Sequence, residues 1–147
     1  VLESYYYAFR IRPFTHRWIR SIKKEPKLYL WDWSEVEAAG ARFENLVAGH
    51  LLKLCHFLHD RDGFAAELSF LRDVDKREVD FLVTVDRKPW FAVEAKLSDE
   101  MPSRDLVYFK DKLKIPFTYQ VVAKPGVHAL VQGVRVVSAD RFLAGLV

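Results

Sequence analysis

Two short apolar runs in the middle of the chain, residues 78–83 and 93–96, carry charged residues at positions where burial alone favours valine or isoleucine. The segment between them contains Asp-Arg-Lys-Pro, which is typical of a turn, so the sequence predicts a hairpin of two strands. Side chains of a strand alternate between its faces, and Glu94 and Lys96 therefore share one face. We expect the carboxylates of Asp80 and Glu94 to converge on one patch of sheet, with the Lys96 ammonium beside them.

Strict alternation also divides the first of these strands into two faces. One face is predicted to carry Val79, Phe81, Val83 and Val85, and the opposite face Glu78, Asp80 and Leu82. Each strand then presents charge within an apolar run, and a polar group in such a position needs a partner.

The residue types of this patch suit a divalent metal that takes part in phosphodiester hydrolysis. Mg²⁺ prefers oxygen ligands and usually takes one or two carboxylates, while water and substrate phosphate oxygens fill its other positions. Such a metal polarises the phosphodiester and activates its bound water, and a nearby lysine stabilises negative charge or orients that water. The spacing alone also fits a solvated ion pair between Glu94 and Lys96 on an exposed strand.

Four residues resemble the motif of the PD-(D/E)XK nuclease superfamily, which has the restriction-endonuclease-like fold. They are Glu44 in a predicted helix, Asp80 in a strand, and Glu94 and Lys96 in the Glu-x-Lys of the next strand. The resemblance implies an α/β domain with a mixed central sheet flanked by helices. It also implies that Asp80 and Glu94 bind Mg²⁺ or Mn²⁺. Glu44 would assist from the helix, and Lys96 would orient the attacking water.

Three longer segments, 27–32, 40–47 and 77–83, resemble the C-terminal domain of a large family of predicted bacterial and archaeal AAA-type ATPases. That domain is of unknown function, and the resemblance covers most of the chain. One departure is Val79, which stands where the nuclease motif has proline. None of the six glycines lies in a Walker A pattern, so the ATPase module is absent from this chain. Because the chain starts at Val1 with no signal leader, we expect it to be a fragment of a longer protein.

The length of 147 residues suits one compact domain and is too short for two ordinary ones. No apolar run is long enough to span a bilayer, so we expect no membrane segment. The single cysteine, Cys55, cannot form an internal disulfide, which fits a reducing cytoplasm. We expect a hairpin, winged-helix remnant or linker over residues 1–33, and a restriction-endonuclease-like domain over 34–147.

Basic residues are concentrated at the start of the chain, although the net charge is only +3. They are interleaved with aromatic and aliphatic residues and comprise Arg10, Arg12, Arg17, Arg20, Lys23, Lys24 and Lys27. Such a stretch suits the backbone of a nucleic acid, and the resemblance to nucleases implies DNA more than RNA. A solvated strand face in an ordinary basic protein explains it equally well.

Hydrophobic periodicity predicts the order helix, three strands, helix, strand, strand, helix. The first helix is expected to start at the capping box of Ser34 and Glu37 or at Gly40, and to end before Asp60. The other predicted elements are strands 64–72, 78–86 and 89–97, a helix over 103–113, strands 117–123 and 133–137, and a helix over 139–146. In the first segment we expect a short helix over 2–8 and extended stretches near 9–12, 17–22 and 28–31.

Several polar residues remain ambiguous on sequence alone. Glu78 is either an extra ligand or a charge at the hairpin edge, and Gln120 either points toward the site or serves only the sheet. The sequence likewise does not decide whether Glu67 belongs to the site. His56 and His59 have a helical spacing that could hold a transition metal, although histidines near a helix end are usually solvated.

Three functions are compatible with these patterns. The first is a metal-dependent nuclease domain that hydrolyses DNA as the C-terminal part of a AAA-type ATPase. The second is a catalytically weak or inactive module that binds DNA or regulates that ATPase. The third is a protein-interaction domain whose aromatic residues contact a partner chain, with Trp18, Trp31, Trp33 and Trp90 as candidates.

Overall fold

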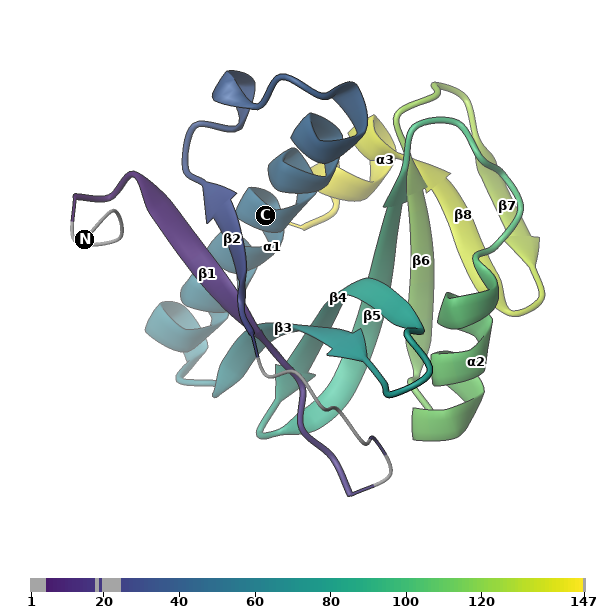
Figure 1. The fold of residues 1–147 in the computed structure, drawn as a ribbon, viewed down its shortest axis with the longest axis horizontal. Coiled ribbons are helices and arrows are strands. Elements are labelled where there is room, and N and C mark those ends of the chain that lie inside the picture. The colour runs from purple at the N-terminus through teal and green to yellow at the C-terminus, as the bar shows by residue number, and fades with distance from the viewer. Residues whose placement is uncertain (1–4, 18, 20–24, 147) are drawn as a thin grey trace.

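The protein is described by a computed structural model that covers residues 5–17, 19 and 25–146 (Figure 1). Within these residues, eight strands form one sheet in the order β2-β1-β3-β4-β5-β6-β8-β7. The strands are β1 (Ala8–Pro13), β2 (Lys27–Leu30), β3 (Ala66–Arg72), β4 (Glu78–Val85), β5 (Lys88–Lys96), β6 (Phe117–Val122), β7 (His128–Val131) and β8 (Val134–Ser138). The helices are α1 (Ala39–Asp62), α2 (Arg104–Leu113) and α3 (Ala139–Ala144), preceded by the short 3-10 helix η1 (Trp33–Glu35).

The sheet is mixed, with antiparallel hairpins at both edges and both parallel and antiparallel pairs between them. β1 pairs parallel with β3, β5 with β6, and β6 with β8, while the remaining neighbours are antiparallel. The prediction of an α/β fold with a mixed central sheet flanked by helices is confirmed.

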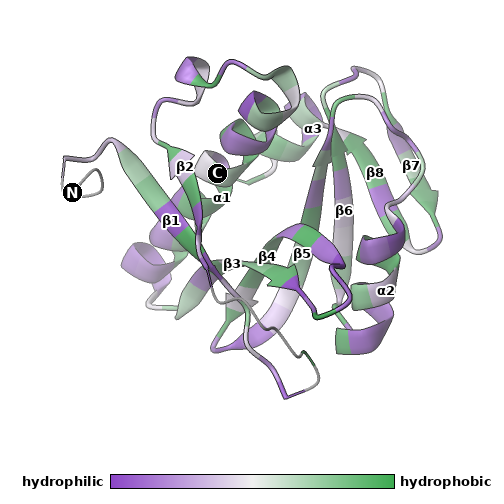
Figure 2. Cartoon of the chain, viewed as in Figure 1, coloured by the Kyte–Doolittle hydropathy of each residue, from purple (hydrophilic) through white to green (hydrophobic). Residues whose placement is uncertain are grey.

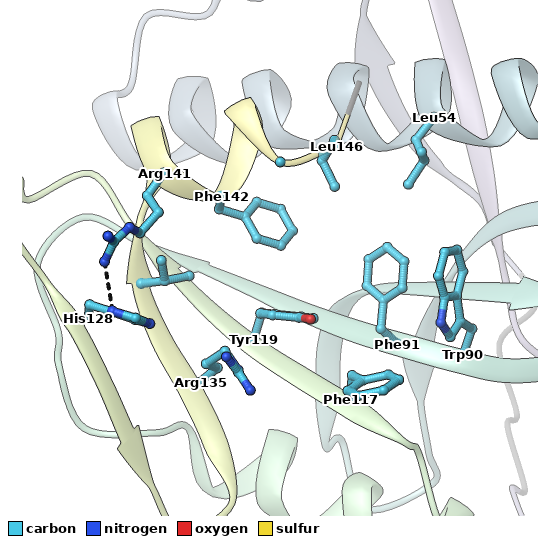
Figure 3. Close-up of a pocket in the computed structure, with 12 residues that line it drawn as sticks. Leu54, Trp90, Phe91, Phe117, Tyr119, His128, Arg135, Arg141, Phe142 and Leu146 are labelled. Atoms are coloured by element: carbon cyan, nitrogen blue, oxygen red, sulfur yellow. Dashed lines mark hydrogen bonds between the residues drawn. The ribbon is translucent and has the colours of Figure 1, made fainter.

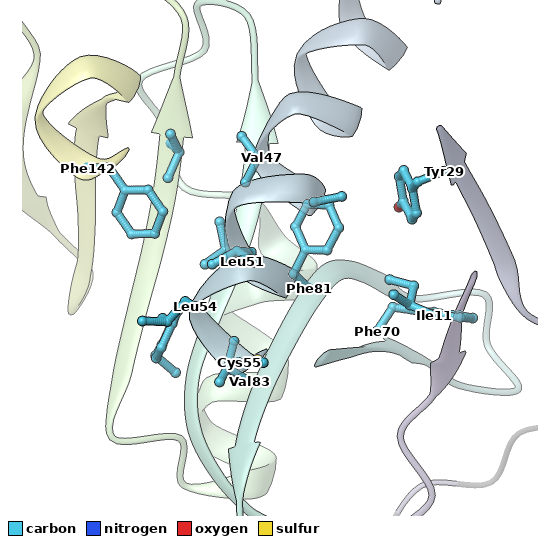
Figure 4. Close-up of a cluster of buried hydrophobic side chains, with 14 of the residues drawn as sticks. Ile11, Tyr29, Val47, Leu51, Leu54, Cys55, Phe70, Phe81, Val83 and Phe142 are labelled. Carbon is cyan, nitrogen blue, oxygen red and sulfur yellow. The ribbon is translucent and has the colours of Figure 1, made fainter. Parts of the chain in front are cut away.

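A large apolar cluster lies between α1, α3 and one face of the sheet (Figure 4). Helix α1 contributes Val47, Leu51 and Leu54 at helical spacing, and these pack against Phe81 of β4 and Phe142 of α3. Burial of such side chains contributes about 1.5–3 kcal/mol each, so this cluster holds α1 firmly on the sheet. The position of α1 matters because this helix carries Glu44.

The opposite face of the sheet is covered by α2. Leu106, Phe109 and Leu113 of this helix are buried against Leu82 of β4 and Ala92 of β5. Figure 2 shows hydrophobic and hydrophilic residues alternating along α2, as expected for a helix with one face on the sheet and one in solvent. The central strands β4 and β5 are therefore covered on both faces.

The N-terminal hairpin is part of the same sheet. β1 and β2 pair antiparallel, and β1 extends the sheet beside β3. Ile11 of β1 and Tyr29 of β2 belong to the apolar cluster under α1. The predicted helix over 2–8 is wrong where it can be compared, because residues 5–7 are turn and bend and Ala8 already opens β1. Most of the predicted extended stretch over 17–22, including Trp18, lies outside the described residues.

The ends of the first helix and one edge strand show the main differences from the expectations. Of the two predicted starts of the first helix, the one at Gly40 agrees with the structure within one residue, because α1 begins at Ala39. The capping box does not start this helix, since Ser34 lies in η1, where its N–H donates to Asp32 Oδ1 at 3.0 Å. The helix continues to Asp62, where Gly63 ends it with a left-handed φ of 70°. β7 was not predicted, because its four residues at the sheet edge have little hydrophobic periodicity.

Candidate functional site

A β-bulge interrupts β4 at the aspartate of the candidate motif. In the ladder between β3 and β4, Ser69 pairs with Leu82 and Leu71 pairs with Val79. Two residues of β4 therefore face one residue of β3, and Asp80 is one of the two. A bulge bends its strand and redirects a side chain, and bulges occur often beside active sites.

The bulge overturns the predicted division of β4 into two faces. Val79 packs with Leu82 in the cluster under α2, whereas Phe81 and Val83 pack in the cluster under α1. The prediction that Val79 shares a face with Phe81 is therefore wrong. Strict alternation holds only in a strand without an inserted residue, and the pattern of residue types carries no sign of the insertion.

The structure brings Asp80 and Glu94 together where β4 and β5 separate. Phe81 and Val93 are the last residues paired in this ladder. Beyond them, the N–H of Ala95 donates to Asp80 Oδ2 at 2.9 Å, and the N–H of Asp80 donates to Glu94 Oε2 at 3.3 Å. Each carboxylate thus replaces a backbone acceptor that a continued ladder would have supplied.

Lys96 lies beside Glu94 at the end of β5. Its Nζ is 3.4 Å from Glu94 Oε1, and its side chain is 41% exposed while that of Glu94 is 7% exposed. Val93 and Ala95 pack in the cluster under α1, so Glu94 and Lys96 project from the other face of the strand. The lysine therefore combines a buried carboxylate partner with an ammonium that solvent or a ligand can reach.

Glu44 reaches the site from α1 and is held there by the N-terminal hairpin. The Tyr29 hydroxyl donates to Glu44 Oε1 at 2.6 Å. Lys27 Nζ lies 3.6 Å from the same oxygen and 3.9 Å from Asp80 Oδ1, and it also forms an ion pair with Glu78. One ammonium thus links the helix carboxylate to the carboxylate at the bulge.

Lys27 is a site residue that the sequence did not identify. It was grouped with the basic residues of the first segment, and no local signal sets it apart from the others. Only the pairing of β2 with β1, and of β1 with β3, carries it to the carboxylates. Glu78 has two cationic partners, Lys27 and Arg72, with Arg72 Nη2 at 2.8 Å. This arrangement favours the interpretation of Glu78 as an ion-pairing charge.

Burial perturbs both central carboxyl groups. Burial, together with the charge of Glu44, raises the pKa of Asp80 to about 6, although Lys27 and Lys96 oppose this change. Burial, together with the charge of Asp80, raises the pKa of Glu94 to about 8, with Lys96 again opposing. Because Glu94 is buried, Asp80 is partly buried and the two groups repel each other, these carboxyls hold their protons to a higher pH than usual.

The raised pKa of Glu94 leads to a prediction about stability. Because burial and the charge of Asp80 raise the pKa of Glu94 from its ordinary value of 4.5 to about 8, the folded state holds an extra proton between these pH values. The free energy of unfolding should therefore decrease as the pH rises through this range. Between pH 5 and pH 9, we expect the free energy of unfolding of wild type to fall by at least about 1 kcal/mol more than that of Glu94→Gln, since a shift of one pKa unit corresponds to about 1.4 kcal/mol.

Urea unfolding at a series of pH values measures this difference. Glu67→Gln is the matched control, because it makes the same substitution at an exposed residue of β3 outside the carboxylate pair. Parallel stability curves for wild type and Glu94→Gln would contradict the assignment of a raised pKa to Glu94.

Gln120 lies beside Glu94 in the parallel ladder between β5 and β6, and it is fully buried. Its Oε1 accepts from the N–H of Ser103 at 2.8 Å, and its Nε2 donates to the carbonyl oxygens of Asp99 and Met101, each at 2.7 Å. The amide is thus fully used in anchoring the segment that leads from β5 into α2. Gln120 therefore holds this segment in place beside Glu94.

The remaining candidates lie elsewhere. His59 Nδ1 is 3.2 Å from Asp60 Oδ1 on an exposed part of α1, while His56 and Glu67 line a separate depression beside β3. No group of three or more His, Cys, Asp or Glu side chains suited to a metal occurs in the described part of the chain. Asp80 and Glu94 form a two-carboxylate arrangement, which suits Mg²⁺ when water and phosphate oxygens complete its coordination.

The tryptophans proposed as contacts for a partner chain lie at the surface where the structure describes them. Trp31, Trp33 and Trp90 are all at least partly exposed, while Trp18 lies outside the described residues. Across the part of the chain that the structure describes, no helix combines the length and apolarity that crossing a membrane requires.

Comparison with known proteins places the chain in a family. Residues 39–142 match the model of a family described as a domain of unknown function (DUF4143). The match spans more than half of the chain and includes Glu44, Asp80, Glu94 and Lys96, whereas Lys27 precedes it. No curated protein and no solved structure matches the chain significantly. The chain belongs to the family of domains of unknown function DUF4143.

Proposed function

We propose that this domain is a metal-dependent nuclease domain of the PD-(D/E)XK type that hydrolyses DNA phosphodiester bonds. The observation that carries the proposal is the pair of carboxylates, the buried Glu94 and the partly buried Asp80, held together at a bulge with Lys96 at the side of Glu94. We also propose that the domain is the C-terminal part of a AAA-type ATPase, as the resemblance implies, and that it lies in the cytoplasm.

Each residue has a physical role in this mechanism. Mg²⁺ or Mn²⁺ held by Asp80 and Glu94 would polarise the phosphodiester and acidify a bound water. Lys96 is oriented by Glu94 and is exposed enough to hydrogen-bond the attacking water or the developing charge on phosphate. Glu44 is fixed by Tyr29 and adds negative charge on the helix side of the site.

Lys27 compensates the negative charge that collects at the site. Its ammonium contacts carboxylates from both α1 and β4 and is mostly buried, with 19% of its side chain exposed. Carboxylates so close together repel one another, and a fixed cation lowers the cost of keeping them ionised. The hairpin outside the matched family range thus contributes to the electrostatics of the candidate site.

Calorimetric titration with Mn²⁺ tests the metal site. We expect saturable binding by the wild-type protein and at least about tenfold weaker binding by Glu94→Gln, because the amide removes one charged ligand. Metal binding must release protons from the carboxyls with raised pKa, so affinity should be higher at pH 8.5 than at pH 6.5. Glu67→Gln serves as control, and equal isotherms for wild type and Glu94→Gln would exclude this metal site.

One observation favours a second candidate, a catalytically weak or inactive module that binds DNA or regulates the ATPase. The Lys27 ammonium already supplies a cation to Glu44 and Asp80, so these carboxylates have a partner without any metal. Fluorescence anisotropy with a labelled DNA duplex separates the two functions. DNA binding that is unaffected by Mn²⁺ and by Glu94→Gln, without cleavage, would favour the module over the nuclease.

A further inference from the structure

A cavity of about 500 Å³ lies between α3, α1 and the sheet, away from the carboxylate site (Figure 3). Its aromatic lining forms a continuous series of ring contacts. Trp90 and Phe91 of β5 are 5.0 Å apart between ring centroids, Phe91 and Tyr119 of β6 are 5.9 Å apart, and Tyr119 and Phe142 of α3 are 5.2 Å apart. Phe117 of β6 adds a ring that is 49% exposed.

Three basic side chains stand together in the same cavity. Arg141 Nη1 donates to His128 Nδ1 at 2.7 Å. The guanidinium of Arg135 makes no hydrogen bond or ion pair with another residue in the described part of the chain. Among the described residues, no aspartate or glutamate lines the cavity. Its positive charge is therefore not compensated from within.

The cavity is distinct from the candidate nuclease site. Trp90 and Phe91 lie in the first half of β5, whereas Glu94 and Lys96 lie in its last three residues. The cavity also opens on the face of the sheet that α1 and α3 cover, the face opposite to the one from which Glu94 projects. A ligand in the cavity would not contact the carboxylates.

We propose that this cavity binds a small aromatic anion, with its ring against the aromatic lining and its acidic group on Arg135 and Arg141. A volume of about 500 Å³ falls within the range of small-molecule sites, which are mostly apolar with a few polar groups that orient the ligand. Aromatic rings stack favourably at these separations. Arginine suits the acidic group because its planar guanidinium can donate two parallel hydrogen bonds to a carboxylate or phosphate.

Two fluorescent probes of nearly the same shape test the proposal. The first, 8-anilinonaphthalene-1-sulfonate, carries an anionic group, and the second, N-phenyl-1-naphthylamine, is its uncharged counterpart. We expect the anionic probe to bind wild type at a single saturable site. The double variant Arg135→Met, Arg141→Met should bind it about tenfold more weakly, the loss expected for removing charge-assisted hydrogen bonds. Binding of the uncharged probe should change less than about twofold.

The control is Arg104→Met, which removes an exposed arginine of α2 and should leave both affinities as in wild type. Competition with 1-naphthoate and with 1-naphthyl phosphate then shows whether a carboxylate or a phosphate is preferred. Unsaturable binding of the anionic probe, equal affinity in wild type and the double variant, or failure of both competitors to displace the probe would each overturn the proposal.

Discussion

Replacement of Asp80 by asparagine should reduce Mg²⁺-dependent cleavage of DNA on the order of 10³-fold, because the site loses one of its two charged metal ligands. The fold should survive the change. An asparagine side chain keeps an oxygen that can accept the hydrogen bond now donated by Ala95, and removing a carboxylate relieves repulsion with Glu94. The loss of cleavage would then be due to the missing metal ligand and not to unfolding of the domain.

A companion variant, Lys96→Met, should reduce DNA cleavage by a similar factor, but for a different reason. Methionine preserves much of the apolar stem but removes the ammonium, so metal binding should persist while turnover falls. Plasmid cleavage in the presence of Mg²⁺ or Mn²⁺, with Glu67→Gln as the control, measures both effects. If both variants kept the activity of wild type, the cleavage would come from a contaminant and the proposed mechanism would fail.

Replacement of Gln120 by leucine should lower the free energy of unfolding by about 2–4 kcal/mol. The side chain has a similar size, but it cannot form the three hydrogen bonds that tie Ser103, Asp99 and Met101 to β6. Loss of a partner for a buried polar group costs about 1–3 kcal/mol for each group, and the groups closest to solvent recover part of this by binding water.

Denaturation in urea gives this change in stability, and Thr118→Val on the same strand is the matched control. Thr118 is also buried but makes one long hydrogen bond, 3.3 Å to the carbonyl oxygen of Gly133, so its variant should lose less than about 1.5 kcal/mol. Similar losses in the two variants would show that the amide of Gln120 has no special anchoring role.

Much of the fold could be predicted because local patterns and tertiary packing agree. The apolar spacing along α1 and α2 matches the buried faces of these helices, and the hairpin of β4 and β5 forms through Asp86 and Arg87, both with positive φ. β7 was missed, although Gln132 and Gly133 after it have the positive φ values of a two-residue turn. The short strand is held by its pairing with β8, which no local pattern reports.

In the candidate site, too, some features follow from the sequence and others appear only in the tertiary structure. The alternation of β5 and the Glu-x-Lys spacing determine that Glu94 and Lys96 share a face, because a strand has a period of two residues. The sequence also predicted that Glu44 lies in a helix. The bulge at Asp80, the ion pairs of Lys27 and the aromatic cavity were decided only by the tertiary structure. These features depend on strand register and on contacts between segments far apart in the chain, and neither is encoded in the spacing of nearby residues.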